Sequence, residues 1–346
     1  MEEHSIYMHR CFQLALHGSF TARPNPMVGA VIVHNGKIIG EGWHRQPGEP
    51  HAEVMAVRSV KDESLLTKST LYVNLEPCSH YGRTPPCSLL ILEKKIPKVV
   101  VSNLDPNPIV AGSGIRMLQS HGVEVITGVE EQKGWEVNRH FFTFHTKKRP
   151  YIHLKWAESA DGLVAPVKKE STHPFVISSP QSLRLTHQLR ASLQAILIGS
   201  ATALSDDPSL TTRLVAGPDP QKFVIDRYRK LPDNLRIFTS SDPALRIVDE
   251  NFALSGDIAV KMDSDWLWLN DLLKILYTKN IQSLQVEGGT KVLNSFIRQG
   301  LWDEAWLIKS PNPLTAGVSG PSKDSLWNYY RSNFTSGRDT VFIFKK

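Results

Sequence analysis

Residues 76–87 read Glu-Pro-Cys-Ser-His-Tyr-Gly-Arg-Thr-Pro-Pro-Cys, and residues 51–53, earlier in the chain, read His-Ala-Glu. The imidazole of His51 and the thiolates of Cys78 and Cys87 form a ligand set that suits zinc. Three protein ligands leave the fourth position of a tetrahedral site open to water, which is the arrangement of a catalytic zinc. Water in that position becomes a nucleophile near neutral pH.

The spacing of these residues indicates a deaminase. H-x-E followed by P-C-x-x-C is the signature of zinc deaminases that act on nucleobases, with the glutamate as acid and base. Glu53 therefore is the candidate catalytic residue. This chain departs from the signature because Cys87 follows Cys78 by nine positions. The longer loop offers His80 and Arg83 as candidate contacts to a substrate group beyond the ring.

Two other interpretations of the trio are a structural zinc site and a set of buried side chains without a metal. A structural site normally has four protein ligands. Glu53 stands where an acid and base is needed, and Cys78 and Cys87 each follow a proline. These features favour the catalytic zinc.

Apolar periodicity around the motif predicts an α/β layered domain. Asn35-Gly36 is a strong hairpin signal between two β-rich runs. Cys11 lies on an apolar helical face that Gly18 ends, so we expect it in the core. The predicted helices are 7–15, 51–60, 87–95, 115–120 and 135–144, and the predicted strands are 28–33, 37–43, 70–75 and 98–102.

Length and composition limit the class of protein. A chain of 346 residues suggests two domains. The net charge of +6 is spread along the chain, which is weak evidence for nucleic acid. No apolar run approaches the roughly 18 residues of a membrane span. Three cysteines and no signal-like N-terminus indicate a cytoplasmic protein.

Three motifs together, 24–29 (Pro-Asn-Pro-Met-Val-Gly), 51–53 and 76–87, resemble the bifunctional deaminase-reductase family of riboflavin biosynthesis. The resemblance covers nearly the whole chain. It implies an N-terminal cytidine-deaminase-like α/β/α domain, a linker after the last helix and a dihydrofolate-reductase-like α/β domain. The expected bounds are 1–146, 147–150 and 151–346. The resemblance also implies that Asn25 contacts the pyrimidine, although an asparagine between prolines can equally be a turn residue.

The second half resembles the reductase of the same family at 151–162, 195–213 and 286–293. A strand that ends in Gly288-Gly289 and is followed by a helix can receive a phosphate on the first N–H groups of that helix. The same pair can also be only a tight turn. The dinucleotide fingerprint G-x-G-x-x-G is absent, so we expect a reductase-type cleft.

The resemblance implies site residues for the second half. A forked cation such as Arg190 or Arg213 suits a phosphate ester, although each can equally be a surface arginine. The chain departs from the family at 176–178, Ala160, Leu163 and 311–317. The implied NADPH contacts are Ala157, Thr202, Asp206, Gly289, Thr290, Lys291, Val292, Leu293, Asn294 and Ser295, and the implied ribotide contacts are Ser178, Arg190, Leu210, Arg213 and Glu287.

The expected activity has two steps. A zinc-dependent hydrolysis deaminates 2,5-diamino-6-(5-phosphoribosylamino)pyrimidin-4-one, and NADPH then reduces the ribosyl group to ribityl. The expected partner is this small ribotide, without nucleic acid or membrane, and we expect a homo-oligomer. The alternatives are a nucleic-acid base deaminase with an appended binding domain, and a deaminase whose second half has become a binding or structural module.

Overall fold

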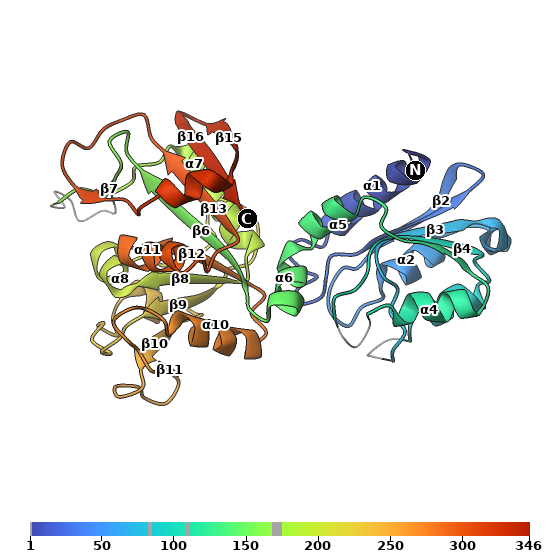
Figure 1. The fold of residues 1–346 in the computed structure, drawn as a ribbon, viewed down its shortest axis with the longest axis horizontal. Coiled ribbons are helices and arrows are strands. Elements are labelled where there is room, and N and C mark those ends of the chain that lie inside the picture. The colour runs from blue at the N-terminus through green and yellow to red at the C-terminus, as the bar shows by residue number, and fades with distance from the viewer. Residues whose placement is uncertain (1, 82–84, 108–110, 168–174) are drawn as a thin grey trace. The chain divides into compact units, whose positions relative to one another are not determined.

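In the computed structural model the chain forms two compact units, Met1–Lys148 and Arg149–Lys346 (Figure 1). The structure describes residues 2–81, 85–107, 111–167 and 175–346. The first unit contains a five-stranded sheet, and the second contains a nine-stranded sheet and a separate two-stranded one.

The sheet of the first unit has the strand order β2-β1-β3-β4-β5. Its strands are β1 (Gly29–His34), β2 (Lys37–Trp43), β3 (Thr70–Leu75), β4 (Lys98–Asn103) and β5 (Glu124–Ile126). β1 pairs antiparallel with β2 and β3, whereas β3, β4 and β5 are parallel. The predicted hairpin is confirmed: Asn35 and Gly36 both have positive φ, at 48° and 73°, as a tight two-residue turn requires.

Helices cover both faces of this sheet, which confirms the α/β/α arrangement. Alternate side chains of a strand point to opposite faces. Val31 and Tyr72 pack with α1, while Ile32 and Val73 pack with α2 and α4. The helices are α1 (Glu2–Leu16), α2 (Ala52–Ser59), α3 (Cys87–Glu93), α4 (Ser113–Ser120), α5 (Glu131–Val137) and α6 (Arg139–Lys147), with the 3₁₀ helix η1 (Glu63–Lys68) before β3.

The predicted helix 135–144 is in fact two helices, and that prediction was wrong. α5 ends at Val137 and α6 begins at Arg139, with Asn138 between them at φ −106° and ψ 25°. The Asn138 side chain accepts a hydrogen bond from the Met27 N–H and donates one to the Met27 carbonyl oxygen. This contact across the unit holds Asn138 where the helix breaks.

The sheet of the second unit has the order β11-β10-β9-β8-β12-β6-β13-β16-β15. The strands from β11 to β13 run parallel, and β16 and β15 complete the sheet antiparallel. The strands are β6 (Tyr151–Glu158), β8 (Ala195–Gly199), β9 (Gln221–Ile225), β10 (Leu245–Asp249), β11 (Ile258–Val260), β12 (Ser283–Gly288), β13 (Glu304–Lys309), β15 (Tyr330–Ser336) and β16 (Asp339–Lys345). β7 (Leu163–Ala165) and β14 (Val318–Ser319) form the small sheet.

Two apolar clusters fill the two faces of the large sheet. Leu154, Leu197 and Val286 pack against α10 and α11 on one face, and Ile196, Ile198 and Val224 pack against α8 and α9 on the other. The helices are α7 (Pro180–Ser192), α8 (Ser200–Asp206), α9 (Arg236–Thr239), α10 (Leu269–Thr278) and α11 (Thr290–Arg298), with the 3₁₀ helix η2 (Asp324–Tyr329). Both units are therefore α/β. Among the described residues, no helix combines the length and apolar character needed to cross a membrane.

Candidate active sites

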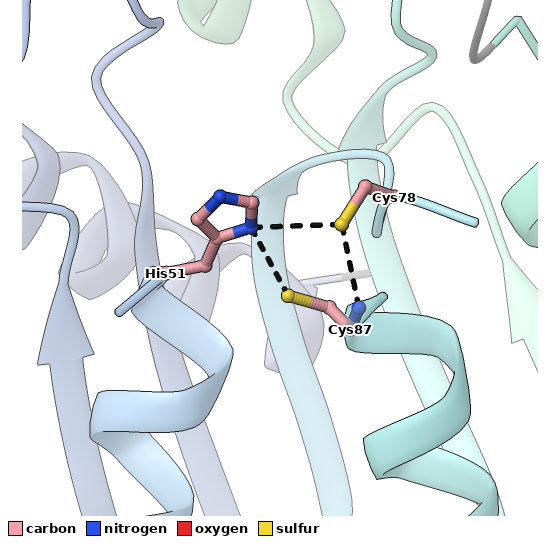
Figure 2. A group of neighbouring side chains, drawn as sticks. All are labelled: His51, Cys78 and Cys87. Atoms are coloured by element: carbon pink, nitrogen blue, oxygen red, sulfur yellow. Dashed lines mark hydrogen bonds between the residues drawn. The ribbon is translucent and has the colours of Figure 1, made fainter. Parts of the chain in front are cut away.

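The side chains of His51, Cys78 and Cys87 converge in the first unit (Figure 2). His51 Nδ1 lies 3.5 Å from Cys78 Sγ and 3.3 Å from Cys87 Sγ. A tetrahedral zinc ion, at about 2.05 Å from nitrogen and about 2.3 Å from sulfur, separates such atoms by about 3.6 Å. The observed spacing and the soft donor set therefore fit zinc, with one coordination position left for a non-protein ligand.

Secondary structure brings the three ligands together. His51 is the N-cap of α2, Cys87 is the first residue of α3, and Cys78 follows the carboxyl end of β3. The positive ends of two helix dipoles thus point toward the ligand cluster, and a helix N-terminus favours negative charge. The Cys87 N–H also donates to Cys78 Sγ at 3.3 Å. These contacts stabilise a thiolate at Cys78.

The electrostatics of the trio match this description. Hydrogen bonds from Cys87 and His51 lower the pKa of the Cys78 thiol despite its burial. The hydrogen bond with Cys78 and burial raise the pKa of Cys87. The hydrogen bond with Cys78 raises the pKa of His51. The thiolate form of Cys78 is therefore already favoured at the site. A bound cation would also favour the thiolate form of Cys87.

Glu53 lies in the first turn of α2 and its side chain is buried. Burial raises the pKa of its carboxyl group, and the nearby His51 opposes that shift. The side chain of Cys87 also acts to lower the pKa of Glu53, against the effect of burial. The carboxyl group is thus beside the ligand cluster, in the position expected of a proton carrier.

The other residues predicted for this site are placed as follows. The Asn25 amide nitrogen lies 3.0 Å from His44 Nε2, and the His44 ring meets the His51 ring edge-on with centroids 5.4 Å apart. His44 therefore lies between Asn25 and the ligand His51. The sequence analysis did not predict His44 as part of this site. His80 is exposed in the loop after Cys78. Arg83 lies outside the described residues.

In the second unit, Arg190 and Glu287 contact each other. The Arg190 guanidinium donates two hydrogen bonds to the Glu287 carboxylate, at 3.0 and 2.8 Å, and a third to the Thr211 carbonyl oxygen. Burial raises the pKa of Glu287, but the charges of Arg190 and Lys155 outweigh it and bring that pKa to about 2. Gln285 also donates to Glu287, at 2.7 Å. Glu287 is thus an anion beside the basic side chains of Arg190 and Lys155.

The three other predicted ribotide contacts lie in different local surroundings. Arg213 is exposed, and its guanidinium donates to Ser209 Oγ and Thr211 Oγ1 at 2.6 and 2.9 Å. Leu210 is buried in the apolar cluster with Ile198. Ser178 is buried two residues before α7.

The structure brings the starts of α8 and α11 together. A Cβ added to Gly289 would lie 3.2 Å from Thr202 Oγ1, and one added to Gly199 would lie 2.9 Å from Val292 Cγ2. Gly289 is the N-cap of α11 and has no side chain to cover the first N–H groups of that helix. Ala157 lies on β6 and Asp206 ends α8.

The predicted segment 289–295 is only partly available to a ligand. Val292, Leu293 and Ser295 are buried. Thr290 Oγ1 donates to the Ser319 carbonyl oxygen, and Asn294 Oδ1 accepts from the Ser322 N–H. The backbone N–H groups at the start of α11, together with exposed Lys291, are therefore its available donors.

Two protein-family models match the chain. The model described as "Cytidine and deoxycytidylate deaminase zinc-binding region" matches residues 1–103, and the model described as "RibD C-terminal domain" matches residues 150–318. The ligand trio, Glu53 and the helix starts around them all lie within the first match. The fold and the metal site thus define a zinc-dependent deaminase joined in one chain to a second, RibD-type α/β domain.

Full-length relatives identify the family. The chain is 35% identical to riboflavin biosynthesis protein RibD of Aquifex aeolicus, covering 98% of each chain. It is 39% identical to RibD of Bacillus amyloliquefaciens, covering 93% of this chain and 87% of that one. The chain belongs to the RibD family.

Solved structures agree with this assignment. Acinetobacter baumannii RibD matches with a TM-score of 0.88 and 30% identity over 99% of each chain. A diaminohydroxyphosphoribosylaminopyrimidine deaminase/5-amino-6-(5-phosphoribosylamino)uracil reductase from Thermotoga maritima matches with a TM-score of 0.85 and 33% identity over 99% of each chain.

Proposed function

We propose that this chain catalyses two consecutive steps of riboflavin biosynthesis. The first unit deaminates 2,5-diamino-6-(5-phosphoribosylamino)pyrimidin-4-one by hydrolysis, and the second reduces the ribosyl group of the product to ribityl. The observation that carries the proposal is the convergence of His51, Cys78 and Cys87 beside a buried Glu53. Membership of the RibD family supports both steps.

His51, Cys78 and Cys87 would hold the zinc ion, whose contribution is to make water a nucleophile near neutral pH. Glu53 accepts a proton from the attacking water and delivers it to the departing amino group, so that ammonia leaves. Burial favours this role, because it raises the pKa of Glu53 toward the range in which a carboxyl group both takes and gives a proton. Asn25, His80 and Arg83 are the proposed contacts to the ribotide.

In the second unit, NADPH would supply a hydride to C1′ of the ribosyl group. The start of α11, from Gly289, and the neighbouring Thr202 are the proposed cradle for a cofactor phosphate, because the first N–H groups of a helix attract anions. Ala157 and Asp206 are further proposed contacts. A ligand at the carboxyl ends of parallel strands β6, β8 and β12 lies where open α/β sheets generally bind ligands.

The Arg190–Glu287 pair is proposed to bind the ribotide in the second unit, with Ser178, Leu210 and Arg213. The pair holds the guanidinium in a fixed orientation, and a fixed forked cation suits a phosphate ester or a pyrimidine carbonyl. Lys155 and His187 lie close enough to influence the charge of Glu287. Their positions add them to the proposed reductase site.

We further propose that the enzyme acts on this small substrate without nucleic acid, in the cytoplasm and as a homo-oligomer. The cysteine usage supports a reducing compartment: Cys11 is a buried free thiol and the other two thiols belong to the metal cluster.

The test is to incubate the purified protein with the diaminopyrimidinone ribotide, with and without NADPH, and to follow ammonia and NADPH together. We expect ammonia in both reactions and NADPH oxidation only after deamination. Ammonia without NADPH oxidation would leave a deaminase whose second unit has lost the reduction. Absence of ammonia from zinc-loaded protein would reject the first step.

A further inference from the structure

Glu76 lies between the last residue of β3 and the ligand Cys78, and its side chain is buried. Its carboxylate accepts four backbone hydrogen bonds. Oε2 accepts from the N–H groups of Asp105 and Gly112, at 3.2 and 2.9 Å. Oε1 accepts from the N–H groups of Gly114 and Ile115, at 3.0 and 3.4 Å. One side chain therefore joins the ligand segment to the segment that leads into α4.

Two other contacts join the same segments independently of Glu76. A Cβ on Gly114 would lie 1.9 Å from the Pro77 carbonyl oxygen, so α4 begins directly against the backbone of the ligand segment. Ser79 Oγ lies 2.6 Å from Ser113 Oγ, next to Cys78 on one side and at the first residue of α4 on the other. Residues 76–79 are thus attached to the start of α4 through Glu76, Pro77 and Ser79, on both sides of Cys78.

Two of the four hydrogen bonds of Glu76, those from the N–H groups of Gly114 and Ile115, satisfy donors in the first turn of α4 that have no intrahelical partner. The first N–H groups of a helix cannot bond to a preceding turn of the same helix, and they carry the positive end of its dipole. A buried carboxylate that accepts several N–H bonds is held more firmly than a neutral acceptor. Only Pro77 separates Glu76 from Cys78. The hydrogen bonds that fix Glu76 therefore also restrict the position of the metal ligand.

We infer that Glu76 is a positioning residue of the deaminase. It holds the turn that carries Cys78 against the start of α4, so that the thiolate has one orientation toward the metal. The inference rests on the proposed zinc site and adds to it a supporting shell that the ligand trio alone does not reveal. Groups of this kind are important because metal ligands bind best when the protein fixes their orientation.

The test compares Glu76→Gln with Glu93→Gln in the full chain. Glutamine keeps the shape of the side chain but directs an N–H₂ group at two backbone donors, which then lose their acceptor. Glu93 is an exposed residue of α3, so its variant controls for the loss of one negative charge near the site. Zinc affinity is measured by competition with a chelator, and kcat and KM are measured for ammonia release.

We expect Glu76→Gln to lower zinc affinity by about 10- to 100-fold, the range found when partners of metal ligands are lost. The kcat of ammonia release at saturating zinc should also fall, while KM changes less. NADPH oxidation with the deaminated intermediate should match that of Glu93→Gln, because Glu76 lies in the first unit. Zinc affinity and kcat within about twofold of the control would overturn the inference.

Glu76→Asp keeps the test decisive if the glutamine variant does not fold. Aspartate retains the charge and four acceptor sites, but its shorter stem cannot reach both pairs of N–H groups. Zinc affinity between those of the wild type and the expected glutamine value supports the inference, and wild-type affinity overturns it. The zinc measurement needs no substrate. A wild-type protein that binds zinc but releases no ammonia would therefore reject the proposed deamination and leave this inference standing.

Discussion

The carboxyl group of Glu53 is buried in the first turn of α2, next to the ligand His51. We predict that Glu53→Gln retains zinc, because His51, Cys78 and Cys87 are unchanged. Ammonia release should fall by about 10²- to 10⁴-fold, the usual contribution of a positioned acid and base. Zinc content and ammonia are measured on the same preparation.

The second unit of the same chain is the control for Glu53→Gln. Its rate of NADPH oxidation, with the deaminated intermediate supplied directly, should not change. Wild-type ammonia release from a zinc-loaded Glu53→Gln protein would show that another group carries the proton, and the proposed role of Glu53 would have to be abandoned.

His187 is buried in the second unit, and its Nδ1 accepts a hydrogen bond from the Arg213 N–H at 3.0 Å. Burial, together with the charges of Arg190 and Arg213, lowers the pKa of His187 to about 4. The unfolded chain has the ordinary pKa of about 6.5 and binds the proton more readily. The contribution of His187 to stability is therefore complete above about pH 6.5 and is lost as the pH falls toward about 4.

His187→Asn tests this pH dependence, because the amide oxygen can accept the same hydrogen bond and does not titrate. We expect the Tm of the second unit to fall less between about pH 7 and about pH 5 in the variant than in the wild type. Thermal unfolding in matched buffers measures the difference. Equal losses of Tm in the two proteins would mean that folding does not lower the pKa of His187.

The deaminase ligands were predictable from sequence because their motif is local and chemically specific. His51, Cys78 and Cys87 were predicted as a metal cluster, and the structure brings their ligand atoms within 4.8 Å of one another. Arg190 and Glu287 were each predicted as a ribotide contact but not as a pair. They are 97 residues apart, and no periodic pattern reports such a contact. The contact between His44, which follows β2, and Asn25 was also not predicted, because no periodic pattern reports it.

Elements were predictable where apolar periodicity and turn residues agree. The strand 70–75 and the hairpin around Asn35 were found at their observed places. The break between α5 and α6 was missed, because its cause is the bond of Asn138 to Met27, 111 residues away. In the second half, β9, β10 and β16 were not predicted, since short buried strands have little periodicity to distinguish them from buried helical turns.

The contact between β2 and α2 places the helix that carries Glu53 and follows His51. A Cβ on Gly42 would lie 2.4 Å from the Ala56 nitrogen and 2.6 Å from the Ala52 carbonyl oxygen. We predict that Gly42→Ala forces α2 away from β2 and lowers the free energy of unfolding of the first unit by about 1–3 kcal/mol, as overpacking generally does. Zinc affinity should fall with it.

Ile38→Ala is the matched control on the same strand, because the Ile38 side chain is 42% exposed. Its effect on the free energy of unfolding should stay within about 0.5 kcal/mol. Urea unfolding followed by chelator competition measures both quantities. A Gly42→Ala protein as stable as the control would show that α2 has room to accept the methyl group, and that its packing on β2 does not set the metal site.

At the scale of the whole molecule, the two units have separate cores. Every described residue of the apolar clusters around β1 and β3 belongs to the first unit, and every one around β6 and β8 belongs to the second. The length of the chain predicted two domains, and the two family models match one part each. The linker expected at 147–150 stays a prediction.

Separate cores lead to a prediction about metal removal. All three ligands belong to the first unit, so zinc stabilises only that unit, by RT ln(1 + [Zn]/Kd), or about 4 kcal/mol at a thousandfold excess over Kd. Chelation under reducing conditions should abolish ammonia release, and added zinc should restore it. NADPH oxidation with the deaminated intermediate should continue throughout. Calorimetry should show one thermal transition moving to lower temperature and another unchanged. Loss of NADPH oxidation on chelation, with recovery on adding zinc, would mean instead that the reductase half depends on the metal of the deaminase half.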